Sequence, residues 1–445
     1  MVSIFSDKKI LKTVLLMLLV EFTWGIGVFV TLSTTTLPTY FTTLSYSKVL
    51  AVTIFLITAL PLLMQFFGRS LIEKFKHKKR GLILLHFFVI VPYLVIAYTD
   101  SLYFNTNPHL QALIVCVMLA FSQFSIGFII PVWVDMIAQI IPAHLRGQYF
   151  GFSSGFVAIG GVLGGAFQIY FVNTQGNAAF RYCFFTTSIF YILSMMVFST
   201  VPISENAFKH PKIDNLIQYI KKGFTAFASK NFRLYIISCF LFTVACGIVP
   251  YLVNFATDPV AVNSLKSGIG LPKEIFSQMT FIQALIGGIG AMIIGIIIDK
   301  RGPRRPWLTF ILFIPVVLIL VPLITNKTVN ISGIMLNISP AFLISVSLLG
   351  MMGISWSVTA PAVLEFSPDG DKSSPVALAN FTLVPAAAAG PMIMQWVINN
   401  YGYKPAFLLS MSIAVVAAIF ALFIHERVKR RDGQAIYADP SHHIS

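Results

Sequence analysis

Charged residues are scarce in this chain of 445 residues, at 11% of the sequence. Soluble globular proteins carry about 25% charged residues, so this chain has too little polar surface to cover a water-soluble fold of its length. Apolar residues make up 57% of the sequence, and the mean hydropathy is +0.83. Because lipid is the natural solvent for such an excess of apolar surface, we expect an integral membrane protein.

Cysteines are also few, and none of the four forms a C-x-x-C pair or a Cys/His spacing: Cys116, Cys183, Cys239 and Cys246. This excludes the usual metal-binding and disulfide frameworks. All four lie in apolar stretches, where we expect small buried side chains. The sequence also lacks a recognisable set of nucleophile, base and orienting residue. We therefore expect neither a cofactor nor a metal, and no enzyme activity.

Acidic residues are about half as numerous as basic residues, 16 against 31, which gives a net charge of +15. In a soluble protein this charge would suggest a nucleic-acid partner. No basic stretch here is interleaved with stacking aromatic residues in a polar context, so nucleic-acid binding is excluded. The charge is explained instead by cations that face anionic lipid and the cytoplasm.

Long apolar runs are what the chain has in abundance. A spanning helix needs about 20 mostly apolar residues. Twelve runs predict such helices: 13–35, 48–68, 81–99, 110–140, 149–172, 179–201, 232–255, 275–298, 307–325, 336–364, 374–398 and 405–425. The first run is too long for the apolar region of a signal peptide and predicts a retained span. The predicted fold is an all-α membrane protein with 12 transmembrane helices.

The basic residues predict the orientation of these spans. With the N-terminus in the cytoplasm, 25 of the 31 Lys and Arg residues fall in inside segments. Cytoplasmic connections are enriched in Lys and Arg, so both termini are expected in the cytoplasm. We expect a multi-pass protein of a bacterial inner (cytoplasmic) membrane.

The chain divides into two halves that repeat each other. A hydrophilic connection, 202–231, separates two sets of six spans, 1–201 and 232–425, and a cytoplasmic tail follows at 426–445. Apolar residues at helical spacing between 213 and 220 predict an amphipathic helix on the inner membrane face. At a constant offset of 226 residues, Pro142 pairs with Pro368 and Gly164 with Gly390. Such a duplication is typical of transporters whose substrate path lies between two bundles.

The segment Gly295-Ile-Ile-Ile-Asp299-Lys300-Arg301-Gly302-Pro303-Arg304-Arg305 carries a family resemblance. It is similar to the G-x-x-x-D-R/K-x-G-R-R pattern of the major facilitator superfamily. In the first half, Glu73 and Lys74 stand for the acid–base pair, but Arg69 replaces the glycine. Two further segments are similar to family features: 142–151, which contains Arg146, and the glycine run 160–165.

The resemblance implies a secondary transporter that works by alternating access between two six-helix bundles. Glycine at position 295 would let two helices approach closely, and Asp299 could accept hydrogen bonds across the interface. Glu365 is a candidate partner near the same depth. The gating and interface candidates are Glu73, Lys74, Asp135, Arg146, Gly295, Asp299, Lys300, Arg301, Gly302, Arg304, Arg305 and Glu365.

Glu21 is the most informative single residue, because it lies within about 5 Å of the middle of the first predicted span. An ionised carboxylate there costs about 3 kcal/mol or more, so it should face the protein interior or a water-filled cavity. Such a carboxyl group could take up a proton and couple it to rocking of the two halves. The alternative is a structural carboxyl group, paired with a hydroxyl such as that of Thr23.

Other polar and aromatic residues in the spans are candidates for a substrate cavity: Trp24, Gln123, Asn254, Gln283, Trp356 and Asn380. Amides in a bilayer need partners, so each of them could equally join two helices. His86 in the third span is expected to be a hydrogen-bonded structural residue. Because these candidates are neutral, they favour a small neutral or weakly charged organic solute.

The sequence therefore predicts a transporter that moves a small organic solute, coupled to protons, by symport or antiport. Export of drugs or metabolites by proton antiport is one alternative, favoured by the glycine run at 160–165. A membrane sensor or scaffold that moves no solute is an alternative of another class. The expected partners are a small-molecule solute, protons and the lipid bilayer.

Overall fold

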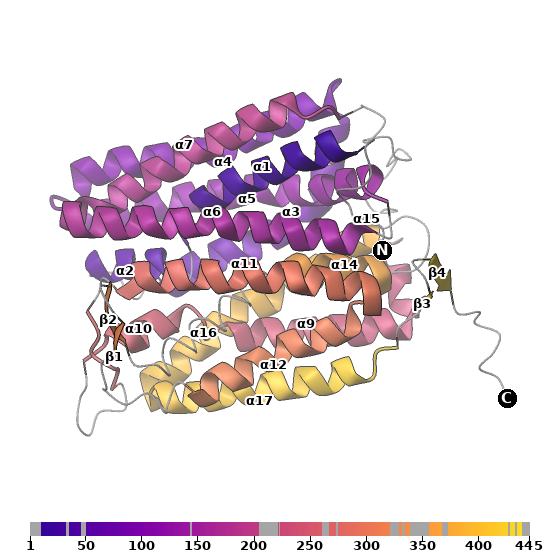
Figure 1. Cartoon of the computed structure of the whole chain (residues 1–445). Helices are drawn as coiled ribbons and strands as arrows, with labels where there is room; N and C mark the ends of the chain where they lie inside the picture. The colour runs from indigo at the N-terminus through magenta and orange to yellow at the C-terminus, as the bar shows by residue number, and fades with distance from the viewer. Residues whose placement is uncertain are drawn as a thin grey trace.

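A computed structural model describes most of the chain (Figure 1), namely residues 10–32, 35–45, 50–142, 145–203, 221, 223–259, 267–272, 275–320, 329–331, 334–338, 356–366, 373–425, 428–431 and 434–437. The first half contains α1 (Leu11–Val30), α2 (Thr36–Thr43), α3 (Leu50–Glu73), α4 (Lys78–Tyr103), α5 (Pro108–Ile140), α6 (Arg146–Gln175), η3 (Gly176–Ala178) and α7 (Ala179–Thr200).

The second half contains η5 (Thr225–Ala228), α9 (Lys230–Cys246), α10 (Tyr251–Thr257), α11 (Ile275–Arg301), α12 (Arg304–Leu320), α14 (Trp356–Phe366), α15 (Ser373–Thr382), α16 (Val384–Tyr401) and α17 (Tyr403–Leu422). Two antiparallel hairpins lie outside the helices, β1 (Val329–Ile331) with β2 (Ile334–Ile338) and β3 (Val428–Arg431) with β4 (Gln434–Tyr437).

Each of the twelve predicted spans overlaps at least one of the described helices. Within the described ranges, eight helical segments are long and apolar enough to cross a membrane, and one of them, residues 146–200, holds both α6 and α7. The start predicted for the tenth span is wrong, because residues 336–338 belong to β2. The amphipathic helix predicted between 213 and 220 lies outside the described residues.

Three of the predicted spans differ from the described helices in ways that their sequences explain. The first ends at Val30, where a run rich in threonine begins, and hydroxyl side chains offer the backbone alternative hydrogen bonds. The seventh is divided into α9 and α10 by a turn that ends at Pro250, a residue without an N–H group. The eleventh is divided at Leu383, two residues before Pro385.

The helices form two groups, α1 to α7 in one and α9 to α17 in the other (Figure 1). In the first group α6 and α7 pack against α1, and α5 packs against both α3 and α4. In the second, α17 packs against α9 and α12, and α16 packs against α9. Across the boundary, α11 lies along α6, and α15 and α16 lie along α3. Division into two six-span domains with the predicted limits stays a prediction.

The two groups contact each other at both ends of the molecule. The end at which α1 and α6 begin is here called the inner end, and the opposite end the outer end, following the predicted orientation. At the outer end α2 lies against α10 and α11. At the inner end α14 lies against α6, and α15 against α5. These contacts describe a conformation in which the two groups of helices meet at both ends.

The contact between α6 and α11 depends on glycine. A Cβ atom on Gly295 would lie 2.6 Å from the carbonyl oxygen of Gly147 and from the Cα atom of Gly151. On another face of α6, a Cβ atom on Gly164 would lie 2.7 Å from the carbonyl oxygen of Ile26 in α1. Small residues thus let α6 approach a helix of its own group and a helix of the other group at backbone distance.

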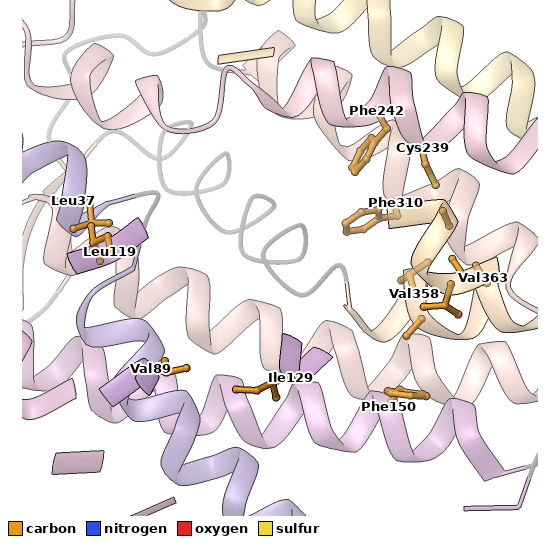
Figure 2. Close-up of a cluster of buried hydrophobic side chains, with 14 of the residues drawn as sticks. Leu37, Val89, Leu119, Ile129, Phe150, Cys239, Phe242, Phe310, Val358 and Val363 are labelled. Carbon is orange, nitrogen blue, oxygen red and sulfur yellow. The ribbon is translucent and has the colours of Figure 1, made fainter. Parts of the chain in front are cut away.

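The apolar core fills the space between the helices of each group. Figure 2 shows part of it, where Cys239 and Phe242 of α9 lie close to Phe310 of α12 and to Val358 and Val363 of α14. Large apolar side chains are also exposed along the helices, as expected of surfaces that face lipid (Leu15, Phe87, Leu113, Ile289, Met392 and Leu408 among them). Polar side chains in the middle of the helices, such as Glu21 and Gln123, are buried instead.

Candidate functional site

Glu21 lies in the middle of α1 and is buried, with 9% of its surface exposed. Its carboxylate accepts hydrogen bonds from the hydroxyl of Ser153 in α6 and from the indole of Trp133 in α5. Both partners are neutral. The hydroxyl of Thr23 donates instead to the carbonyl oxygens of Leu19 and Val20 in its own helix, at 3.0 Å each.

Trp133, the indole partner of this carboxylate, belongs to a cluster of aromatic rings. Trp24 stacks on Tyr191 of α7 with 3.9 Å between ring centroids, and its ring lies edge-on to that of His86 at 5.5 Å. The ring of His86 lies 6.0 Å from Trp133, which lies 5.1 Å from Phe198. Burial among rings lowers the local dielectric, which strengthens the interactions of any charge placed there.

His86 is held by its own helix, as the sequence predicted for a structural histidine. Its Nδ1 atom lies 2.8 Å from the carbonyl oxygen of Leu82. Because a carbonyl oxygen only accepts hydrogen bonds, Nδ1 carries the proton in this arrangement. His86 therefore contributes a fixed ring to the wall around Glu21.

Tyr149 adds a hydroxyl group to the same region. It lies on α6 one turn before Ser153, and 1% of its surface is exposed. The charge of Glu21 acts on its hydroxyl. Within the described part of the chain, this hydroxyl has no hydrogen-bond partner. Buried polar groups are nearly always paired, so this unpaired hydroxyl requires a functional or conformational explanation.

Among the described residues, hydrogen bonds at Thr35 and at Asn380 join the two groups of helices directly. Near the outer end, the hydroxyls of Thr35 and Thr280 lie 2.6 Å apart, and both residues are fully buried. In the inner half, the amide of Asn380 in α15 donates to the side-chain carbonyl of Gln65 in α3 at 2.6 Å. Each bond must break when the two groups of helices separate at its position.

The predicted cavity residues lie on helices of both groups. Trp24 packs within the first group of helices, and Asn380 pairs with Gln65. Gln123 of α5 and Gln283 of α11 are buried, with 9% and 6% of their surfaces exposed. Asn254 is half-buried in α10. Trp356 is the first residue of α14, and its side chain is not among those described. Their roles in binding stay predictions.

The predicted gating residues gather at the inner end, where α3, α5, α11 and α14 end and α6 and α12 begin. Arg146 donates to the carbonyl oxygens of Ala138 and Ile141 at 2.6 and 3.2 Å, which caps the end of α5. Gly302 ends α11 with a φ of 80°, a conformation that favours glycine. Arg304 donates to the carbonyl oxygen of Leu422 in α17.

The remaining gating candidates are described less completely. Lys74, Lys300, Arg301 and Arg305 are exposed, and Glu365 is half-buried in α14. The backbone positions of Glu73, Asp135 and Asp299 are described, but their side chains are not. A charged latch between these residues therefore stays a prediction.

Among the described residues, sequence reasoning missed two tyrosine–aspartate pairs at the outer end, one buried and one half-buried. The hydroxyl of Tyr40 in α2 donates to Asp100 of α4 at 2.6 Å, and Gln111 of α5 donates to Tyr40 at 3.0 Å. In the other group, Tyr403 of α17 donates to Asp258, which follows α10, also at 2.6 Å. A carboxylate at the end of an apolar run was a signal for both, but its partner depends on tertiary packing.

The described residues thus define a class: a helical membrane protein of two packed groups of helices, with a buried carboxylate in one group and polar links between the two. The sequence model of the Major Facilitator Superfamily matches residues 62–325 and 245–441. The chain belongs to the major facilitator superfamily, so the resemblance drawn from its motifs is confirmed.

Several solved structures have a fold similar to that of this chain. A D-xylose-proton symporter has a TM-score of 0.67 and 16% identity, and the match covers 96% of this chain and 100% of that chain. The fucose:proton symporter FucP of E. coli has a TM-score of 0.63 and 12% identity, and the match covers 93% of this chain and 98% of that chain. The xylose transporter XylE from E. coli, in a partially occluded inward-open conformation, has a TM-score of 0.64 and 14% identity. That match also covers 93% of this chain and 98% of that chain. No curated protein matches the sequence.

These comparisons confirm the predicted architecture of twelve helices in two bundles. They also make the protein a multi-pass membrane transporter and not an enzyme. The first group of helices is called the N bundle below, and the second the C bundle. Among the described residues, no group of three or more His, Cys, Asp or Glu side chains could hold a metal ion.

Proposed function

We propose that the protein couples the movement of a small, neutral or weakly charged organic solute to the movement of protons, by alternating access between the two bundles. The observation that carries this proposal is the carboxylate of Glu21, buried in the middle of α1, whose hydrogen-bond partners among the described residues are the neutral side chains of Ser153 and Trp133. A carboxyl group in such a place is costly to ionise unless water or a cation reaches it.

Coupling follows from this cost. When the bundles rock, the distance of Glu21 from water changes, so the free energy of its charged form differs between conformations. A proton that binds one conformation more tightly than another shifts the population toward the first. By linkage, a solute that favours one conformation changes the affinity for the proton by the same factor. Glu21 thus supplies the element that a proton gradient needs to drive transport.

The proposed solute is a small polyol or sugar. The similar structures include transporters of xylose and fucose, by their own titles. In this chain the candidate contacts are neutral amides and indoles, which suit hydroxyl groups. Gln123 and Gln283 are the buried amides whose helices belong to opposite bundles. Both could therefore contact a solute held between the bundles.

Flux measurements test this proposal. Purified protein in liposomes would be offered a panel of pentoses, hexoses and polyols, together with amines and weak acids, with and without an imposed proton gradient. We expect gradient-driven flux of at least one neutral solute. The sign of the flux relative to the gradient distinguishes symport from export by antiport. If the protein is folded but moves no solute of the panel, the result would favour the alternative hypothesis of a membrane sensor or scaffold.

The role of Glu21 is tested by Glu21→Gln, which keeps the size of the side chain and removes its titration. We expect solute exchange to continue while the response to the proton gradient disappears. The matched control is Asp100→Asn, which removes another buried carboxylate of the N bundle at its outer end. A Glu21→Gln protein that keeps the wild-type pH dependence would exclude the proton role.

A further inference from the structure

We propose that Tyr149 carries the proton between Glu21 and the inner end of the molecule. This inference rests on the proton role proposed for Glu21 above. A buried carboxylate cannot exchange its proton with water alone, and we assign this transfer to a second residue of the N bundle. Glu21 binds the proton, and Tyr149 is the group through which the proton enters or leaves.

The position of Tyr149 suits this step. It lies in the first turn of α6, three residues after Arg146, where that helix begins. Ser153, the hydroxyl partner of Glu21, lies one turn further along. Four residues of helix rise about 6 Å, and the charge of Glu21 still acts on the Tyr149 hydroxyl. Tyr149 therefore stands between the carboxylate and the inner end.

The hydroxyl of Tyr149 is free to take part. With 1% of the residue exposed, its oxygen has no hydrogen-bond partner among the described residues. A buried hydroxyl without a partner is unfavourable, so packing alone does not account for a tyrosine at this place. Phenylalanine would fill the same volume beside Phe150, whose ring lies 5.8 Å away.

The other groups that contact Glu21, or that pack beside Trp24 and Trp133, are less suited to this step. Trp133 of α5 donates its only N–H to the carboxylate and cannot accept a proton. The Nε2 atom of His86 could accept a proton, but His86 lies eight residues into α4 from the inner end, whereas Tyr149 lies three residues into α6. Tyr191 of α7 stacks on Trp24. Ser153 touches the carboxylate but lies further from the inner end than Tyr149 does.

The step balances as a simple proton transfer. The carboxylic acid of Glu21 gives its proton to the hydroxyl oxygen of Tyr149, while the O–H bond of Tyr149 breaks and its proton passes to a water molecule at the inner end. Glu21 is left as a carboxylate, Tyr149 is neutral again, and nothing is oxidised or reduced. The reverse sequence loads the carboxylate.

The rate of protonation tests this role without a known solute. In protein reconstituted in liposomes, the carboxyl C=O infrared band of Glu21 is identified by its loss in Glu21→Gln. After a pH jump, we expect the band in Tyr149→Phe to change about 100-fold more slowly than in the wild type, the lower end of what a positioned proton-transfer group contributes. The amplitude at equilibrium is expected to remain.

The matched control is Tyr235→Phe, which removes a buried hydroxyl of the C bundle that donates to Thr359 at 3.3 Å. We expect the wild-type rate there. A wild-type rate in Tyr149→Phe would overturn the role of Tyr149 and leave that of Glu21 intact. A wild-type protein without any titrating band from Glu21 would instead overturn the proposed function.

A second substitution covers the case in which Tyr149→Phe does not fold. Tyr149→Gln keeps a side chain that donates and accepts hydrogen bonds but does not relay protons as a hydroxyl does. Slow protonation in this variant supports transfer through Tyr149. The wild-type rate would mean that Tyr149 is not on the proton path, and would overturn the inference.

Discussion

The contact between α6 and α11 at the inner end makes a quantitative prediction for Gly295→Ala. The added Cβ atom would lie 2.6 Å from the carbonyl oxygen of Gly147 and from the Cα atom of Gly151. Carbon atoms prefer separations of about 3.5–4.0 Å, so the two helices must move apart by roughly 1 Å there. Overpacking of this kind costs about 1–3 kcal/mol.

That cost applies only to conformations in which α6 and α11 touch at the inner end. Opening of the inner end relieves it, so the population should shift toward open conformations by about 5- to 150-fold. Spin labels at Lys74 and Lys300, which are exposed at the inner end of opposite bundles, report the separation. We expect the distance distribution of Gly295→Ala to gain a longer component.

Gly288→Ala on the same helix is the comparison. Its Cβ atom would meet the Cβ atom of Ala158 at 2.9 Å and the carbonyl oxygen of Gly155 at 3.4 Å. The clash is milder, and we expect a smaller shift. A shift for Gly288→Ala as large as that for Gly295→Ala, or unchanged distances in both, would refute the reasoning that backbone contact at Gly295 holds the inner end closed.

Three further substitutions test the polar links. Asn380→Ala leaves the side-chain carbonyl of Gln65 unpaired and should favour opening of the inner end by about 1–3 kcal/mol, read with the same labels; unchanged distances would contradict it. Thr280→Val removes one of the two hydroxyls that meet at the outer end and should favour opening there, measured by labels on α2 and α10. Tyr40→Phe deprives buried Asp100 of its hydrogen-bond donor. It should lower the free energy of unfolding by about 1–3 kcal/mol, measured by thermal unfolding in detergent. The same substitution at an exposed tyrosine such as Tyr170 should leave the free energy of unfolding unchanged.

Much of the fold could be predicted because lipid imposes a simple rule on sequence. A span needs an apolar run of about 20 residues, and each predicted run overlaps a described helix. Breaks within runs were harder to predict. Pro250 and Pro385 lie at two of them, but a proline in a spanning helix can also be accommodated as a kink. The start of the tenth span was wrong because the apolar residues of β2 satisfy the same hydropathy rule as a helix.

The candidate site was predictable only in part. The depth of a residue in its span can be inferred from the sequence, but the helix that its side chain faces cannot. The position of Glu21 in its run was enough to expect burial, and it is buried. Its hydroxyl partner is Ser153, not the nearby Thr23, because the carboxylate faces α6. Tyr149 gave no signal at all, since its importance depends on two helices that are far apart in sequence.

The two faces of α6 have a consequence for how fast the protein can change conformation. Where Gly151 and Gly295 meet, backbone touches backbone, and no side chain has to leave one rotamer for another when the helices separate. Little of the activation barrier can then arise from this contact. Among the described residues, the hydrogen bonds at Thr35 and at Asn380 must also break when the bundles separate, and they contribute to the barrier. The glycine contact thus sets how closely the two bundles pack at the inner end, while the polar links add to the cost of separating them.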